Sequence, residues 1–117
     1  MDEISIYDKT HVIEINNSEM RRYDIDPNEY FSCNSSISSI IVNDAKQSLA
    51  MMMSVLKNED TPARMISLIN AAALVYLSGK SESISDGIDI CKNSLETNSA
   101  YDKLNQIIEL TNGFEEC

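Results

Sequence analysis

Two adjacent carboxylates near the start of the sequence, Asp2 and Glu3, have the clearest capacity for chemistry. Carboxylate oxygens are hard ligands of the kind that Mg²⁺ prefers. Magnesium usually completes its octahedron with substrate phosphates and water, so two neighbouring carboxylates alone would hold it weakly. The residue types are thus compatible with weak metal binding that needs further ligands, and the alternative is a solvated acidic pair.

Other polar residues give weaker support for a functional site. His11 and Glu14 could act as a base and its partner, but they are three positions apart in a strand-like segment, which places them on opposite faces. We expect His11 to face solvent. Ser5 and Thr10 have no general base at a recognisable spacing, so nucleophilic catalysis has no support. We predict no catalytic residue and no residue that binds an organic cofactor.

Composition excludes several classes of protein. Nine Lys and Arg residues face nineteen carboxylates, and the net charge is -10, which disfavours binding to nucleic acid or to an anionic membrane. Cys33, Cys91 and Cys117 lack C-x-x-C spacing, so neither a zinc cage nor a disulfide framework is indicated. There is no secretory signal and no apolar run of roughly 20 residues. We expect a cytoplasmic protein with reduced thiols.

The elements that must position these residues change in character near residue 40. His11–Ile15 and Met20–Ile25 are rich in β-branched and aromatic residues, and the Asn-containing segment between them predicts a hairpin turn. Asp26 and Pro27 are typical of a turn or a single helical turn. Residues 32–39 form a polar connector with little periodicity.

The remainder predicts four helices. Residues 44–57 carry one apolar stripe, and the methionine run Met51–Met53 is interpreted as adaptable core filling. Thr61 and Pro62 begin a second helix, which ends at Gly79. This helix is apolar on nearly all sides, so either the other helices surround it or part of it faces a missing domain.

Two further helices begin with apparent capping boxes, one at Ser83 with Asp86 and one at Ser99 with Asp102. The last of them ends at Asn112-Gly113. Each of the two has an apolar stripe; the stripe residues are Ile84, Ile88, Cys91 and Leu95 in the first, and Leu104, Ile107 and Ile108 in the second.

We therefore expect an α+β fold in one domain, residues 1–117, with a hairpin region at 1–31 and a helical region at 40–113.

Arg64 lies near a helix start, where a positive charge is unfavourable. We expect it to form a salt bridge with Glu59 or Asp60, and the alternative is a contact in a longer fold.

Four segments together resemble anthranilate phosphoribosyltransferases, in one register over essentially the whole chain. The segments are Met1-Asp-Glu-Ile-Ser5 followed by Thr10-His-Val-Ile-Glu-Ile, Thr61-Pro-Ala-Arg64 through Asn70-Ala-Ala-Ala-Leu-Val-Tyr-Leu-Ser-Gly-Lys80, Ser83-Ile-Ser-Asp-Gly87, and Ala100-Tyr-Asp-Lys-Leu104. The resemblance implies the C-terminal part of the α/β domain of a nucleoside-phosphorylase/phosphoribosyltransferase-like fold. It also implies transfer of phosphoribosyl from phosphoribosyl pyrophosphate to anthranilate in tryptophan biosynthesis, with Asp2 and Glu3 as ligands of a second Mg²⁺ that bridges the pyrophosphate.

The sequence also departs from the family pattern. Val42-Asn43-Asp44 stands where the family has Gly-Gly-Asp, and Ser48 stands where it has Asn. The family's Gly-rich phosphoribosyl-pyrophosphate loop and its Lys-His-Gly-Asn-Arg stretch are absent from a chain whose glycines are Gly79, Gly87 and Gly113. We therefore predict a fragment, or a split or truncated homologue, that is inactive alone, binds no metal alone, and pairs with the missing N-terminal portion or with itself. The alternative is a non-catalytic remnant that acts as a structural or protein-interaction module.

Overall fold

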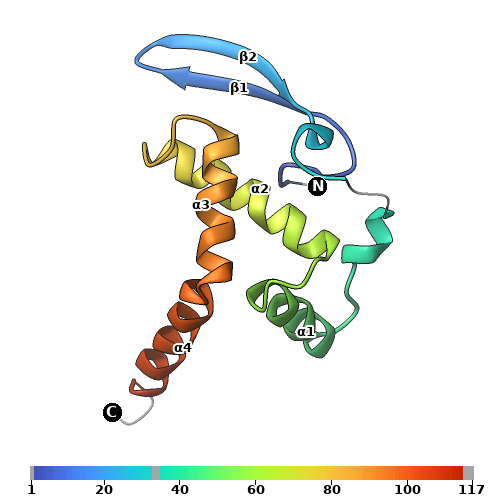
Figure 1. Ribbon diagram of the computed structural model, residues 1–117, viewed down its shortest axis with the longest axis vertical. Coiled ribbons are helices and arrows are strands. Elements are labelled where there is room, and N and C mark those ends of the chain that lie inside the picture. Colours follow the sequence, from blue (N-terminus) through green and yellow to red (C-terminus); the bar gives the residue numbers. More distant parts are fainter. Residues whose placement is uncertain (1, 33–34, 115–117) are drawn as a thin grey trace.

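The computed structural model describes residues 2–32 and 35–114. Within this part a short N-terminal loop leads into a β-hairpin, and four α-helices follow, as Figure 1 shows. The predicted fold class, a hairpin followed by about four helices, is confirmed. Cys33, Cys117 and residues 33–34 of the predicted 32–39 connector lie outside the described residues.

The hairpin pairs β1 (Thr10–Asn16) with β2 (Glu19–Ile25) in antiparallel register, from Thr10 opposite Ile25 to Asn16 opposite Glu19. Asn17 and Ser18 form a two-residue turn with φ values of 47° and 71°. Positive φ at both central positions matches the twist of the flanking strands, and Asn tolerates this region well. The predicted hairpin is confirmed, with strands slightly longer than expected.

Two short 3-10 helices follow the hairpin. In η1 (Pro27–Glu29) the Asp26 carboxylate accepts a hydrogen bond from the Asn28 backbone N–H at 3.0 Å, as the Asp-Pro pattern predicts. The second, η2 (Ile37–Ile40), occupies part of the segment that we expected to be an irregular connector. A 3-10 helix of four residues is too short to produce a detectable hydrophobic period, which explains the difference.

Three of the four α-helices begin at a side-chain cap. For α1 (Ala45–Leu56) the cap is Asp44, for α2 (Pro62–Leu77) it is Thr61, and for α3 (Ile84–Glu96) it is Ser83. Each side chain accepts a hydrogen bond from the backbone N–H three residues later, which satisfies a donor that the helix leaves free. Beyond the other end of α2, Gly79 adopts φ 72°, the left-handed conformation predicted for a glycine at that place.

The fourth helix, α4 (Ser99–Asn112), begins differently from the prediction. Its cap is Asn98, in the left-handed conformation at φ 60° and without a side-chain capping bond, so the predicted Ser99–Asp102 capping box is wrong. Only Thr97, the C-cap of α3, and Asn98 lie between the two helices. A side-chain cap usually comes from a residue with extended backbone, and this short connection in left-handed geometry makes Ser99 the first helical residue instead.

Helix α2 lies at the centre of the molecule, below the hairpin and crossed by α3 (Figure 1). The residues of the central core cluster come from the N-terminal loop, the hairpin, α2 and α3; they are Ile6, Ile25, Ile69, Ala72 and Ile88. Gly87 lets α3 approach α2 unusually closely, because a Cβ atom at this position would lie 2.7 Å from the Ala72 carbonyl oxygen. The central packing therefore depends on backbone contact between two helices.

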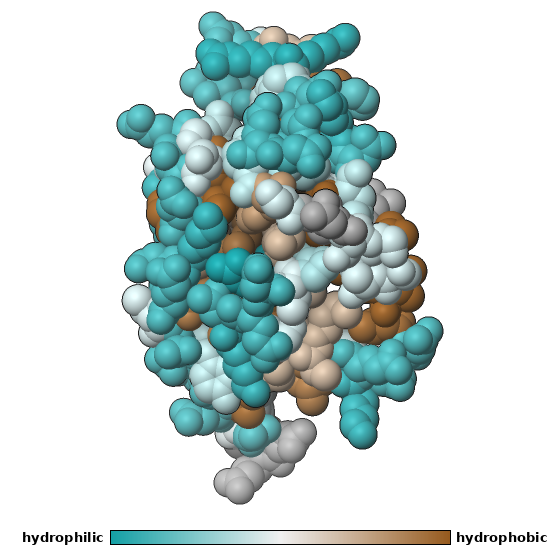
Figure 2. All heavy atoms as spheres, turned by 45° about the vertical axis from the view of Figure 1, so that its right-hand side comes forward, coloured by the Kyte–Doolittle hydropathy of each residue, from teal (hydrophilic) through white to brown (hydrophobic). Residues whose placement is uncertain are grey.

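The outer helices contribute little to the core. Neither α1 nor α4 has a buried residue, and the predicted apolar stripes are largely exposed at Leu49 (55%) and Ile107 (51%). Hydrophobic surface is visible at several places between hydrophilic side chains in Figure 2. The radius of gyration is 16.2 Å, whereas a compact chain of this length has about 13 Å. The expected stripes exist, but within the described residues they are covered only in part, because Met53, Leu56 and Leu104 are half-buried.

Among the described residues, none of the helices combines the length and the apolar character needed to cross a membrane.

Candidate metal-binding loop and adjoining groove

The loop that carries Asp2 and Glu3 is shaped by its own hydroxyl groups. The Ser5 hydroxyl oxygen accepts a hydrogen bond from the Tyr7 backbone N–H at 3.0 Å, and the Thr10 hydroxyl oxygen accepts one from the Ser5 backbone N–H at 3.1 Å. Ile6 follows and is buried in the core. Both hydroxyl oxygens thus accept bonds that fix the backbone, an arrangement typical of Ser and Thr in tight turns.

The Asn70 side chain holds this loop against α2. Its amide oxygen accepts a hydrogen bond from the Ile4 backbone N–H at 2.9 Å, and its amide nitrogen donates to the Ile4 carbonyl at 3.0 Å and to the Ile66 carbonyl at 2.9 Å. The amide thereby fixes the residue directly after Glu3. Sequence analysis placed Asn70 in a motif without a role. The available signal was an amide in an otherwise apolar helix, since such a group needs partners when it is buried.

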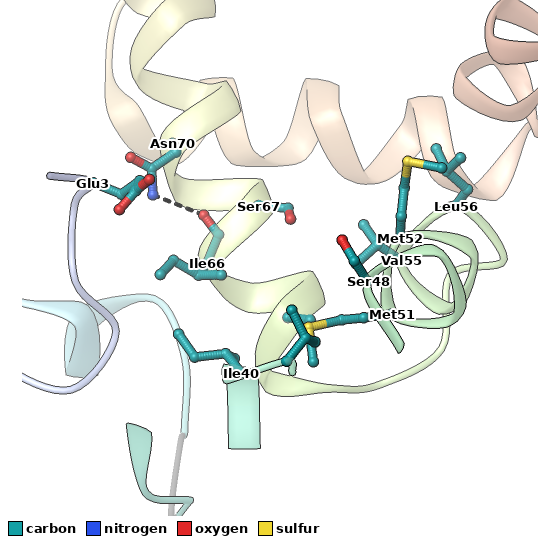
Figure 3. A pocket seen from close by; sticks show the side chains of 12 residues that line it. Glu3, Ile40, Ser48, Met51, Met52, Val55, Leu56, Ile66, Ser67 and Asn70 are labelled. Atoms are coloured by element: carbon teal, nitrogen blue, oxygen red, sulfur yellow. Dashed lines mark hydrogen bonds between the residues drawn. The ribbon is translucent and has the colours of Figure 1, made fainter. Parts of the chain in front are cut away.

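A groove of about 590 Å³ lies between α1 and α2 beside this loop (Figure 3). Met51, Met52 and Leu56 of α1 supply apolar side chains, and Glu3 and Asn70 lie together at one end. The methionine run was interpreted as core filling, but Met52 is 43% exposed and Met51 is half-buried, so both line an open groove. Flexible, polarizable methionines are suited to a surface that accommodates a partner.

Val42 and Ser48, at which the sequence departs from the pattern of the resemblance, both contribute to the wall of the same groove. Side chains stabilise the start of α1 beside them. The Asp44 carboxylate accepts a hydrogen bond from the Gln47 backbone N–H at 2.7 Å, while the Gln47 side chain accepts one from the Asn43 backbone N–H at 3.0 Å. The start of α1 is thus capped by side chains from both directions.

Asp2 and Glu3, the predicted metal ligands, would supply only part of a magnesium site. Both are exposed, and their carboxylate oxygens are suited to Mg²⁺. No cluster of three or more His, Cys, Asp or Glu side chains with metal-binding geometry occurs within residues 2–32 and 35–114. The donor set therefore fits an ion that takes its other ligands from phosphate oxygens and water.

His11 and Glu14 lie on opposite faces of β1, as predicted. The His11 side chain is 85% exposed, and its Nδ1 lies 2.6 Å from the Asp24 carboxylate on β2, a partner that sequence analysis did not identify. Glu14 instead faces α2 and accepts a hydrogen bond from the Tyr76 hydroxyl at 2.9 Å. The two residues therefore do not form a base–acid pair, and Glu14 anchors the hairpin to α2.

Arg64 forms the predicted salt bridge with Asp60, although the distance of 3.9 Å is long. A shorter contact joins its Nε to the Asn58 side-chain oxygen at 2.6 Å. Asn58 itself has φ 60°. The guanidinium thus stabilises the turn between α1 and α2, which compensates for a positive charge at a helix start.

Cys91 is half-buried between α3 and its neighbours, and burial raises the pKa of its thiol. A raised pKa keeps the sulfur protonated and unreactive at neutral pH. The predicted place of Cys91 on the apolar stripe of α3 agrees with the structure, where Ile88 and Leu95 of the same stripe are buried.

Raised tyrosine pKa values predict sensitivity to alkali. The hydrogen bond to Glu14 raises the pKa of Tyr76, and burial raises the pKa of Tyr23 and of Tyr30. The folded chain then keeps protons that the unfolded chain loses, so this stabilisation is complete below about pH 10 and is lost as the pH rises through the folded pKa values. We expect the urea midpoint to fall above about pH 10, and to fall less in Tyr76→Phe. An unchanged midpoint across that range would contradict the expectation.

Comparison with known proteins identifies the family. Residues 1–101 match the family model described as glycosyl transferase family, a/b domain. The chain belongs to this family. The matched glycosyl transferase segment includes the Asp2–Glu3 loop, the hairpin, Asn70 and Gly87, so the features described above lie in the shared domain.

Among the curated relatives of this chain are anthranilate phosphoribosyltransferases. The protein from Nitrosomonas europaea is 33% identical over 112 residues, which cover 96% of this chain and 33% of that protein. The protein from Dechloromonas aromatica is 38% identical over 114 residues, which cover 97% of this chain and 34% of that protein. The chain is a partial homologue that spans about a third of the length of these relatives.

Proposed function

We propose that this chain is the C-terminal third of an anthranilate phosphoribosyltransferase-type enzyme of tryptophan biosynthesis in the cytoplasm, and that it has no turnover of its own. The observation that carries the proposal is the Asp2–Glu3 loop, which Asn70 fixes at the end of an open groove. The matched family and the relatives, each about three times as long, support it.

In the proposed reaction, the amino nitrogen of anthranilate forms a bond to the anomeric carbon of phosphoribosyl pyrophosphate. The bond from that carbon to the pyrophosphate oxygen breaks, and the nitrogen loses a proton. Bound Mg²⁺ would neutralise charge on the departing pyrophosphate. The role of this chain is to hold Asp2 and Glu3 where the ion needs them, through the bonds between Asn70 and Ile4. The substrate-binding loops come from the remaining two-thirds of the fold.

The test combines this chain with the complementary two-thirds of the Nitrosomonas europaea relative, expressed as a separate polypeptide. We expect anthranilate consumption when both polypeptides, phosphoribosyl pyrophosphate and Mg²⁺ are present, and none with this chain alone. Turnover by this chain alone would refute its predicted inactivity. A stable complex of the two polypeptides without turnover would refute the proposed activity.

Within that complex, the double variant Asp2→Asn, Glu3→Gln should lower kcat/KM on the order of 100-fold, because the site loses the charge that holds the ion. Higher Mg²⁺ should restore part of the rate. The matched control is Asp89→Asn, Glu96→Gln, which removes the same charge from exposed positions of α3. An equal effect of both double variants would show that net charge matters rather than the proposed ligands.

A second candidate function is a non-catalytic interaction module. The extent of uncovered apolar surface on α1, α4 and the hairpin favours it. Under this alternative the mixed complex forms but never consumes anthranilate, which the same experiment reveals.

A further inference from the structure

Helix α1 is attached to the rest of the fold by few apolar side chains. It packs against α2, but more sparsely than α3 does. Every residue of α1 is half-buried or exposed, and its half-buried apolar side chains all lie in its second half; they are Met51, Met53, Val55 and Leu56. Two of these four side chains are methionines, so the docking of α1 depends strongly on thioether groups.

Met51 combines this docking role with access to solvent. It lines the open groove between α1 and α2, and Figure 3 shows its side chain extending from α1 into that groove. A groove of about 590 Å³ admits molecules far larger than hydrogen peroxide. Met52 lines the same groove but is exposed, whereas Met65 of α2 is half-buried against the core cluster. Met51 is thus both within reach of a small oxidant and part of the contact between α1 and α2.

We propose that Met51 is a reversible oxidation site, and that its conversion to methionine sulfoxide by hydrogen peroxide releases α1 from α2. A lone pair of the sulfur attacks one peroxide oxygen, so that an S–O bond forms as the O–O bond breaks. The sulfur loses two electrons and the peroxide is reduced. The proton of the transferred hydroxyl passes to the departing hydroxide, which leaves as water. Methionine sulfoxide reductases convert the product back to the thioether.

The release follows from the polarity of the product. A sulfoxide is polar where the thioether was apolar, and its burial without a hydrogen-bond partner costs free energy, so oxidation disrupts contacts that are rich in methionine. Helix α1 has no buried residue to hold it in place when this contact weakens. Helices α2 and α3 are held together by the close approach at Gly87 and by the central core cluster, both away from the groove. The inference therefore predicts a local release of α1, and it is independent of the proposed function.

The first test exposes this chain to hydrogen peroxide and follows each methionine by peptide mass spectrometry. We expect Met51 and Met52 to oxidise on the order of tenfold faster than Met65, because access to the oxidant governs the rate. If Met51 stays reduced while Met52 reacts, the groove does not admit the oxidant to the contact and the inference is wrong. Oxidation of Met65 as fast as that of Met51 would also overturn it, since the groove would then confer no selectivity.

The second test measures amide hydrogen exchange in the oxidised chain. The α1 amides should exchange on the order of tenfold faster than in the reduced chain, whereas the α3 amides should change little. Met51→Leu should abolish this response, because leucine fills a similar volume without a thioether. The matched control, Met52→Leu, should retain it, since Met52 is exposed.

Equal responses of the two variants would overturn the inference, as would a loss of α3 protection together with that of α1. Treatment of the oxidised chain with methionine sulfoxide reductases should restore the protection of α1. If the thioethers are regenerated and α1 stays unprotected, the oxidation is damage and not a reversible modification, and the inference is wrong.

Discussion

Replacing Gly87 with alanine is expected to force α2 and α3 apart and to lower the free energy of unfolding by about 1–3 kcal/mol. The new methyl group would lie 2.7 Å from the Ala72 carbonyl oxygen and 3.1 Å from the Ala72 Cα and Cβ atoms. Backbone atoms cannot move aside as a flexible side chain can. Glycine costs a helix about 1 kcal/mol relative to alanine, so the substitution would stabilise an isolated helix. The predicted loss is therefore opposite in sign to the helix propensity.

Urea unfolding followed by circular dichroism measures this effect. The control is Gly113→Ala at the end of α4, where the nearest atom is 3.4 Å from the added Cβ and φ is −67°. We expect Gly113→Ala to leave the midpoint unchanged or raise it slightly. A stabilised Gly87→Ala variant would mean that α2 and α3 are not held at this close distance.

Replacing Asn70 with alanine is expected to release the N-terminal loop and to cost about 2–4 kcal/mol, because the Ile4 N–H and both carbonyl partners lose their hydrogen bonds together. The loop that carries Asp2 and Glu3 would then no longer be fixed to α2. In the reconstituted complex we expect a rise in the Mg²⁺ concentration needed for half-maximal rate of roughly 10–100-fold, the usual effect of losing a residue that orients metal ligands.

Hydrogen exchange separates this positioning role from a general loss of stability. In Asn70→Ala the amides of residues 3–5 should exchange faster even at temperatures where the α2 and α3 amides remain protected. Asn93→Ala is the control, because Asn93 is exposed on α3. If residues 3–5 keep their protection, Asn70 does not anchor the loop.

Features determined by neighbouring residues could be predicted from the sequence. The Asn-containing turn, the Asp26-Pro27 start of η1, and the caps at Thr61 and Ser83 agree with the structure, since each depends on a few adjacent residues. The same reasoning was wrong for Ser99. Its spacing to Asp102 equals that of Ser83 to Asp86, but the backbone of the preceding residue decides which side chain can cap.

Features determined by distant residues could not be predicted. Helical periodicity identifies the apolar sides of α1 and α4, but not whether another element covers them. The link between Ile4 and Asn70 spans 66 positions, and no local pattern indicates it. For the candidate site, Asp2 and Glu3 were found through the family resemblance, whereas the groove beside them depends on how α1, η2 and α2 pack together.

The contact between Asn70 and Ile4 also has a kinetic consequence, because it closes a loop of most of the chain. Closing long loops is entropically costly, and contacts between residues far apart in sequence tend to form late in folding. The hairpin turn and the helices can form first from local interactions. The two acidic side chains would then reach their final position only in a chain that has already folded, so a partly folded chain would not present the metal-binding pair in its native position.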